Sequence, residues 1–165
     1  MESIREYKTA SILTPVYVTV EVIMEVLIPF VMASLIDKGI EAGSMSVIWK
    51  YGIILLVLAM IALAFGSMAG HQASIASCGL AQNLRKDMYY RIQNFSFSNI
   101  DKFSTASIVT RLTTDVTNVQ NAYQMLIRVA VRAPIMMIFA MIMSFTINVK
   151  ISLIFLATIP VLGFI

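Results

Sequence analysis

The sequence predicts an all-α membrane protein whose long transmembrane helices extend into the cytoplasm. Three observations support this class. Of the 165 residues, 59% are hydrophobic and only 13% are charged, with a mean hydropathy of +0.84, whereas about 25% of a soluble domain is charged. Several apolar runs reach the roughly 20 residues that a helix needs to cross a bilayer. Between them, the polar stretch 84–134 keeps helical apolar spacing, so the helices continue beyond the membrane.

The first predicted span runs from about residue 11 to 36. It is preceded by a short segment, Glu2–Lys8, in which Ile4 and Tyr7 alternate with charged residues. This segment is either an amphipathic lead-in at the membrane surface or a frayed terminus. The span is somewhat longer than the bilayer requires, which favours a tilted helix.

Two acidic residues, Glu21 and Glu25, interrupt this first span. Because they are four residues apart, they share one helix face, and a charge at the bilayer centre costs about 2.5–3.5 kcal/mol. They either contact a cationic substrate or protonate in a transport pathway. Alternatively, they are held by polar groups on helices outside this stretch, or they lie in the outer leaflet with access to water. We place both in the candidate substrate pathway together with His71.

The second span is expected over about residues 47–77, after a turn-rich loop at 37–46, and its helix continues without proline to about residue 99. A stripe of small residues repeats along it every fourth position, where helices can approach closely in lipid: Ala62, Gly66, Gly70, Ser74 and Cys78. His71 stands beside this stripe. A single histidine in such a run is either hydrogen-bonded to a neighbouring helix or part of a proton relay.

A cytoplasmic helical hairpin is expected over about residues 78–131. Its returning arm has an apolar seam with a period near 3.5, typical of a coiled coil: Leu112, Val116, Val119, Tyr123, Leu126 and Ala130. The third span follows at about 132–147. A short turn at Asn148–Lys150 then leads to a fourth span at 151–165 that is incomplete, so we expect an N-terminal fragment of a larger domain.

Three stretches, in this order, resemble the transmembrane domain of ATP-binding-cassette (ABC) exporters. They are PFVMASLIDKGI at 29–40, the hairpin sequence around VTRLTTDV at 109–116, and RVAVRAP at 128–134. The resemblance implies a partial six-helix exporter domain of the multidrug or lipid type. It also implies that the hairpin tip is a coupling segment docked on nucleotide-binding domains, formed by Asp101, Lys102, Phe103, Ser104, Thr105, Ala106, Ser107, Ile108, Val109, Arg111 and Asp115. The family usually has glycine where this chain has Ala106.

Basic residues predict the orientation. Nine of the twelve lie on the hairpin side, and Lys38, Lys50 and Lys150 lie on the other. The N-terminus and the hairpin are therefore expected in the cytoplasm of a cell, with the chain in a bacterial plasma membrane. The nine are Arg5, Lys8, Arg85, Lys86, Arg91, Lys102, Arg111, Arg128 and Arg132.

The sequence predicts neither catalysis nor a metal site in this chain. It contains no GxxxxGK[ST] loop, and one histidine with one cysteine is too few for zinc. Acidic residues alternate with the basic ones on the hairpin, which argues against nucleic-acid binding. By the resemblance, ATP and magnesium would bind separate nucleotide-binding domains, and the other partners would be the lipid bilayer, a second transporter half and a small amphiphilic substrate. The alternative function is a self-contained membrane scaffold whose hairpin recruits a partner.

Overall fold

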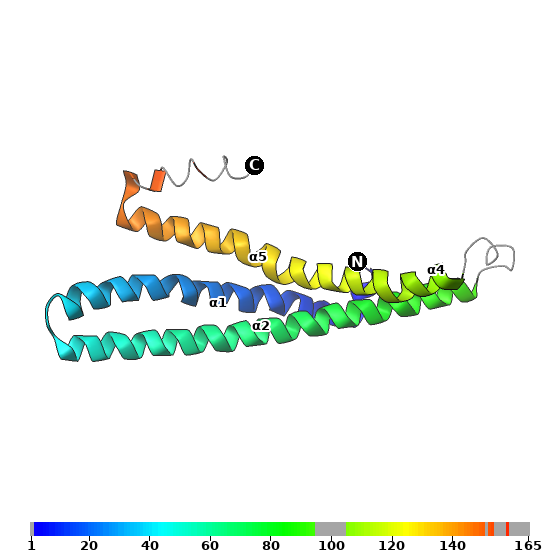
Figure 1. The fold of residues 1–165 in the computed structure, drawn as a ribbon, viewed down its shortest axis with the longest axis horizontal. Helices are drawn as coiled ribbons and strands as arrows, with labels where there is room; N and C mark the ends of the chain where they lie inside the picture. Colours follow the sequence, from blue (N-terminus) through cyan, green and yellow to red (C-terminus); the bar gives the residue numbers. More distant parts are fainter. Residues whose placement is uncertain (1, 95–104, 151, 154–157, 159–165) are drawn as a thin grey trace. The chain divides into compact units, whose positions relative to one another are not determined.

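The computed structural model describes residues 2–94, 105–150, 152–153 and 158, and every regular element in these ranges is helical (Figure 1). Three of the helices are long, which agrees with the predicted all-α class: α1 (Lys8–Leu35), α2 (Met45–Gln93) and α5 (Val116–Ile147). The shorter elements are the 3₁₀ helix η1 (Glu2–Tyr7), the π-helical turns η2 (Ile36–Ile40) and η3 (Arg111–Asp115), and the helix α4 (Thr105–Thr110).

Three helical stretches are long and apolar enough to cross a membrane: Ile4–Ile40, Met45–Gln93 and Ser107–Ile147. The predicted spans at 11–36, 47–77 and 132–147 lie inside these stretches, one in each. The second helix extends to Gln93 as one element of 49 residues, about 75 Å at 1.5 Å per residue. It therefore exceeds the hydrocarbon thickness by more than a factor of two. The incomplete fourth span lies outside the described residues except for 152–153 and 158.

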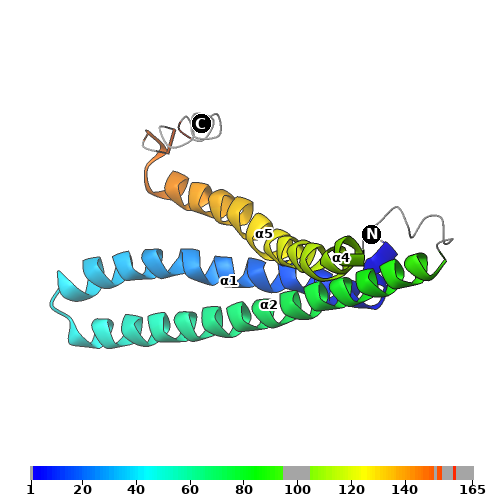
Figure 2. The ribbon, with the colours of Figure 1, turned by 45° about the vertical axis from the view of Figure 1, so that its right-hand side comes forward.

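The chain divides into two compact units. The first comprises Met1–Val18 and Gly66–Val131. In it, the start of α1 lies beside α2 and α5 in both views of the ribbon (Figures 1 and 2). Its buried cluster joins all three helices through Ala10, Ala73, Ala76 and Ile127, with Tyr123 packed against them. The Tyr123 hydroxyl donates to Ser11 Oγ at 2.9 Å, which ties α5 to α1.

The small-residue face of α2 is displaced from the predicted one. The buried positions of α2 are Ala69, Ala73, Ala76, Ser77, Gly79 and Ala81. By contrast, Ser74 and Cys78 of the predicted stripe are exposed, and Ala62, Gly66 and Gly70 are half-buried. A second row of small residues runs beside the predicted one, and only the packing of α1 and α5 decides which row is covered.

The predicted coiled-coil seam of α5 is half correct. Val116 is buried and Leu112 and Tyr123 are half-buried, but Val119 and Leu126 are 46% and 61% exposed and Ala130 is exposed. Ile127 is buried instead of Leu126. The covered face thus follows the natural helical period of 3.6, and a period of 3.5 holds only where two helices supercoil around each other.

The N-terminal segment is docked on α2, so the frayed alternative does not describe it. Arg5 Nη2 donates to Asp87 Oδ1 at 2.9 Å. The Tyr7 ring covers Gly79 so closely that a Cβ at residue 79 would overlap it. The Tyr7 hydroxyl also donates to Gln82 Oε1 at 3.4 Å. Arg5 itself has a φ of 32°, a left-handed conformation that costs a residue with a Cβ some energy.

The second unit comprises Thr19–Phe65 and Arg132–Ile165. Here α1 and α2 form a hairpin closed by the π-turn η2 and by Gly43, whose φ of 60° suits glycine. Ser44 N–H donates to the Gly39 carbonyl at 3.0 Å. Gly39 is required by close packing, because a Cβ there would lie 2.9 Å from Ile48 Cγ1. The first half of the predicted loop at 37–46 is therefore helical.

The turn that follows α5 is fixed by short hydrogen bonds. Lys150 N–H donates to Asn148 Oδ1 at 3.0 Å, and Ser152 N–H donates to the Asn148 carbonyl at 3.1 Å. The hydroxyls of Ser144 and Ser152 lie 2.7 Å apart. The predicted turn at Asn148–Lys150 thus follows directly after α5.

Candidate functional site

A cluster of three charged residues lies between α1 and α5 in the second unit. Arg132 Nη1 donates to Glu21 Oε1 at 3.0 Å, while Nη2 donates to Glu25 Oε1 at 2.8 Å and to Glu25 Oε2 at 2.7 Å. The spacing of four residues brings both carboxylates to the same side of α1. One guanidinium can therefore bridge them, since its donors form a fixed planar fork.

The cluster is partly enclosed and carries a net charge of −1. The exposed fraction of the side chain is 9% for Glu21, 32% for Glu25 and 33% for Arg132. Glu21 Oε2 is buried and has no hydrogen-bond partner among the residues that the structure describes. An unpaired buried oxygen of a carboxylate is costly, so this atom is the one place in the cluster that would gain from a further donor.

The glutamates thus have a partner within the chain, Arg132, in addition to any that helices outside this stretch would supply. From the sequence, Arg132 is expected only as a marker of the membrane edge. A signal was nevertheless present: an arginine at the start of an apolar run needs a counter-charge as much as the glutamates do. His71 is not part of this cluster. It lies on α2 in the first unit, where its side chain is exposed.

The hairpin of the first unit is fastened by Arg85 of α2. Its Nε donates to the Leu112 carbonyl at 3.3 Å, and its Nη2 donates to Thr117 Oγ1 at 3.3 Å. Gln120 Nε2 adds a contact to Cys78 Sγ at 3.3 Å. These bonds hold α2 against η3 and the start of α5, so the two arms of the hairpin are joined at these positions.

The predicted coupling segment is only partly described. Asp101, Lys102, Phe103 and Ser104 lie outside the described residues. Thr105–Thr110 forms the short helix α4, in which Ser107 and Ile108 are half-buried and Val109 is 53% exposed. Arg111 and Asp115 are both exposed in η3, and neither forms an ion pair with any residue that the structure describes.

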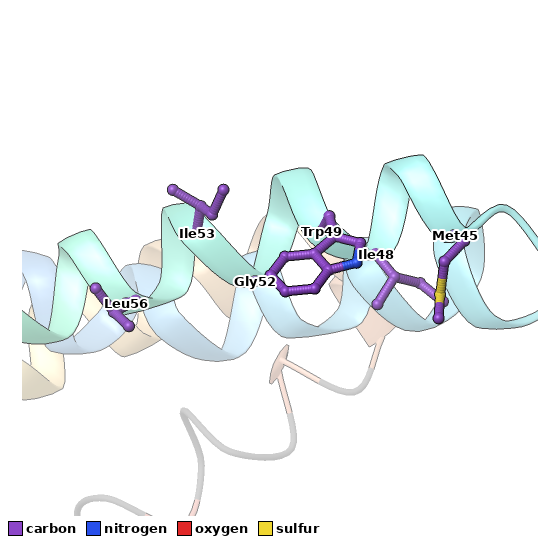
Figure 3. Close-up of a pocket in the computed structure, with 6 residues that line it drawn as sticks. All are labelled: Met45, Ile48, Trp49, Gly52, Ile53 and Leu56. Atoms are coloured by element: carbon purple, nitrogen blue, oxygen red, sulfur yellow. The ribbon is translucent and has the colours of Figure 1, made fainter.

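An apolar hollow of about 470 Å³ lies on the first turns of α2. Figure 3 shows its six lining residues, all from one helix: Met45, Ile48, Trp49, Gly52, Ile53 and Leu56. Trp49 is 68% exposed and Leu56 is 65% exposed. Such a surface suits lipid or a neighbouring helix, and the position of Trp49 at the start of a span is typical of the membrane interface.

The three long apolar helices are typical of a helical membrane-spanning domain. The family of ABC transporter transmembrane regions matches residues 12–165, so the chain belongs to this family. The resemblance stated from the sequence is thereby confirmed.

The chain is similar to several bacterial transporters. It is 35% identical over 142 residues to an uncharacterized ABC transporter ATP-binding protein of Bacillus subtilis, which covers 86% of the chain and 25% of that protein. A protein of the same description from Mycobacterium tuberculosis is 26% identical over 98% of the chain and 28% of its own length. An ATP-dependent lipid A-core flippase of Pseudoalteromonas translucida is 25% identical over 85% of the chain and 24% of its own length. The chain thus spans about a quarter of these relatives.

Proposed function

We propose that this chain forms the first part of the transmembrane domain of an ATP-driven exporter and that its hairpin couples ATP hydrolysis to transport. The partners would be two nucleotide-binding domains, which bind ATP and magnesium, and a second transporter half, identical or different. The N-terminus and the hairpin would lie in the cytoplasm of a bacterium. The family match supports an exporter over a self-contained scaffold, which no observation on the described residues favours.

The observation that supports coupling is the continuity of α2. This helix of 49 residues extends from an apolar end at Met45 to a polar end at Gln93 without interruption. Arg85 bonds its polar end to Leu112 and Thr117, close in sequence to α4. Two joined helices can carry a displacement at the tip into the membrane, provided that the bundle has two packing states.

Ile108→Asp in the full-length transporter tests the coupling role. A charge on the half-buried face of α4 should prevent docking on the nucleotide-binding domains, so basal ATPase activity should persist while stimulation by transported amphiphiles falls at least several-fold. Asn118→Asp is the matched control, because it adds the same charge at an exposed position of α5. If substrate stimulates the ATPase activity of both variants as strongly as that of the parent transporter, this segment has no coupling role.

Glu21 and Glu25 belong to the substrate pathway in this proposal, and the net charge of their cluster favours a cationic amphiphile. The unpartnered Glu21 Oε2 supports this choice, since an ammonium group of a substrate could donate to it after a shift of α5 relative to α1. His71 stays a pathway candidate on sequence grounds alone.

A further inference from the structure

Four residues before Arg132, α5 presents a second arginine, Arg128, in a different environment. Arg128 lines a hollow of about 310 Å³ in the first unit together with Asn121, Gln124, Met125 and Val129. These positions follow the i, i+3, i+4, i+7, i+8 pattern, so they share one face of the helix. Whereas Arg132 binds two carboxylates, Arg128 forms no hydrogen bond or ion pair with any residue in the described ranges.

The guanidinium of Arg128 packs against α2 at Gly70, where the absence of a side chain leaves room for it. Its Nη1 lies 3.5 Å and its Cζ 3.8 Å from the point that a Cβ on Gly70 would occupy. The group therefore packs against α2 at Gly70, and Arg128 is half-buried. No residue that the structure describes accepts a hydrogen bond from its donors. A half-buried cation without a counter-charge is unfavourable, and it gains from an anion that brings several acceptor oxygens.

The neighbours of Arg128 define which anion fits. Asn121 and Gln124 carry amide donors on the same face, two turns and one turn before the arginine, and no carboxylate of the described residues lines the hollow. Met125 and Val129 lie on its apolar side and are 64% and 51% exposed. A phosphate group needs hydrogen-bond donors such as the guanidinium and the two amides, and an acyl chain needs an apolar surface such as that of Met125 and Val129.

From this arrangement we infer that the Arg128 hollow binds the phosphate headgroup of an anionic membrane lipid. Arg128 lies four residues before the predicted start of the third span at about residue 132, which corresponds to the level of the lipid headgroups. The hollow is lined by α5, and basic groups on the positively charged side of a membrane protein attract anionic lipids. Arg128 and the two amides hold the phosphate, while Met125 and Val129 contact the acyl chain.

Titration of the purified full-length transporter with short-chain phosphatidylglycerol, in detergent, tests the site through the apparent dissociation constant. Arg128→Gln should weaken binding about tenfold, the loss of one charge-assisted hydrogen-bonding group, and Arg128→Lys should recover part of it. Arg91→Gln is the control, because Arg91 is an exposed arginine on α2 outside the hollow. Gly70→Val keeps the charge and adds methyl groups beyond a Cβ position that already touches the guanidinium, so it should also weaken binding.

Three results would overturn the inference. Equal weakening by Arg91→Gln and Arg128→Gln would indicate diffuse attraction with no site. Equal affinity for inorganic phosphate and phosphatidylglycerol would identify a soluble anion as the ligand. A melting temperature lowered by Arg128→Gln without any change in lipid affinity would show that Arg128 pairs with a carboxylate elsewhere in the transporter.

Discussion

At the scale of single residues, Arg132 is the residue on which the second unit depends most. It alone neutralises Glu21 and Glu25 within the described chain. Arg132→Met should leave both carboxylates uncompensated and so reduce the free energy of unfolding. Broken buried pairs cost about 3–5 kcal/mol, and we expect a loss near the lower end of this range because two of the three groups are partly exposed. The measurement is the apparent melting temperature of the full-length transporter in detergent.

The combined variant Arg132→Met, Glu21→Gln, Glu25→Gln separates structure from substrate binding. Because it removes all three charges, it should regain much of the stability that Arg132→Met loses. If it is as unstable as the single variant, the arginine stabilises α5 by packing and not by charge. If it is stable and still transports cationic amphiphiles at the parent rate, the glutamates have no role in the substrate pathway.

The sequence predicts that Glu21 and Glu25 need a polar or charged partner, but it does not predict that this partner is Arg132. Two carboxylates on one face of a transmembrane helix require a counter-charge, and hydropathy alone shows this. The choice of Arg132 over Arg128 depends on which face of α5 lies against α1, which no single-sequence pattern reports. Positions 101–104 of the coupling segment lie outside the described residues, so that prediction stays open there.

At the scale of elements, the register between η1 and α2 rests on one glycine. Gly79→Ala should force the Tyr7 ring away from α2 and lower the apparent melting temperature, because the new Cβ would overlap the ring. Gly52→Ala is the matched control. Nothing lies within 4 Å of its Cβ position in the same helix, so it should raise helix stability by roughly 0.5–1 kcal/mol.

A second substitution makes this prediction specific. Tyr7→Ala in the Gly79→Ala background should remove the overlap, so the double variant should lose less stability than the two single variants together. Strictly additive losses would contradict the contact between η1 and α2.

The sequence predicts that these helices form, but it does not predict which face of each helix is buried. The long apolar runs, the absence of proline between Met45 and Gln93, and the polar hairpin predict α1, α2 and α5 directly. In α2, however, Ala69 and Ala73 stand in a row equivalent to Gly66 and Gly70, and residue size cannot distinguish the two rows. In α5, both Leu126 and Ile127 are apolar, so the buried one is decided by tertiary packing.

At the scale of the whole molecule, the distribution of basic residues makes a prediction about topology. Nine of twelve lysines and arginines lie on the side of the hairpin, and positive charge is retained in the cytoplasm. The turn between α1 and α2 should therefore face outwards and η3 should face inwards. Single cysteines at exposed Ala42 and Thr114 report these two sides in the full-length transporter expressed in intact bacteria.

The experiment requires Cys78→Ser first, because Cys78 is exposed and would react itself. Serine keeps an acceptor for Gln120 Nε2, which donates to Cys78 Sγ in the parent chain. A membrane-impermeant maleimide should then label Ala42→Cys in intact cells and Thr114→Cys only after permeabilisation. The reverse labelling would place the hairpin outside the cell, away from any ATP-hydrolysing partner in the cytoplasm. The coupling proposal would then lose its physical basis. The lipid affinity of the Arg128 hollow would still be tested by its own titration.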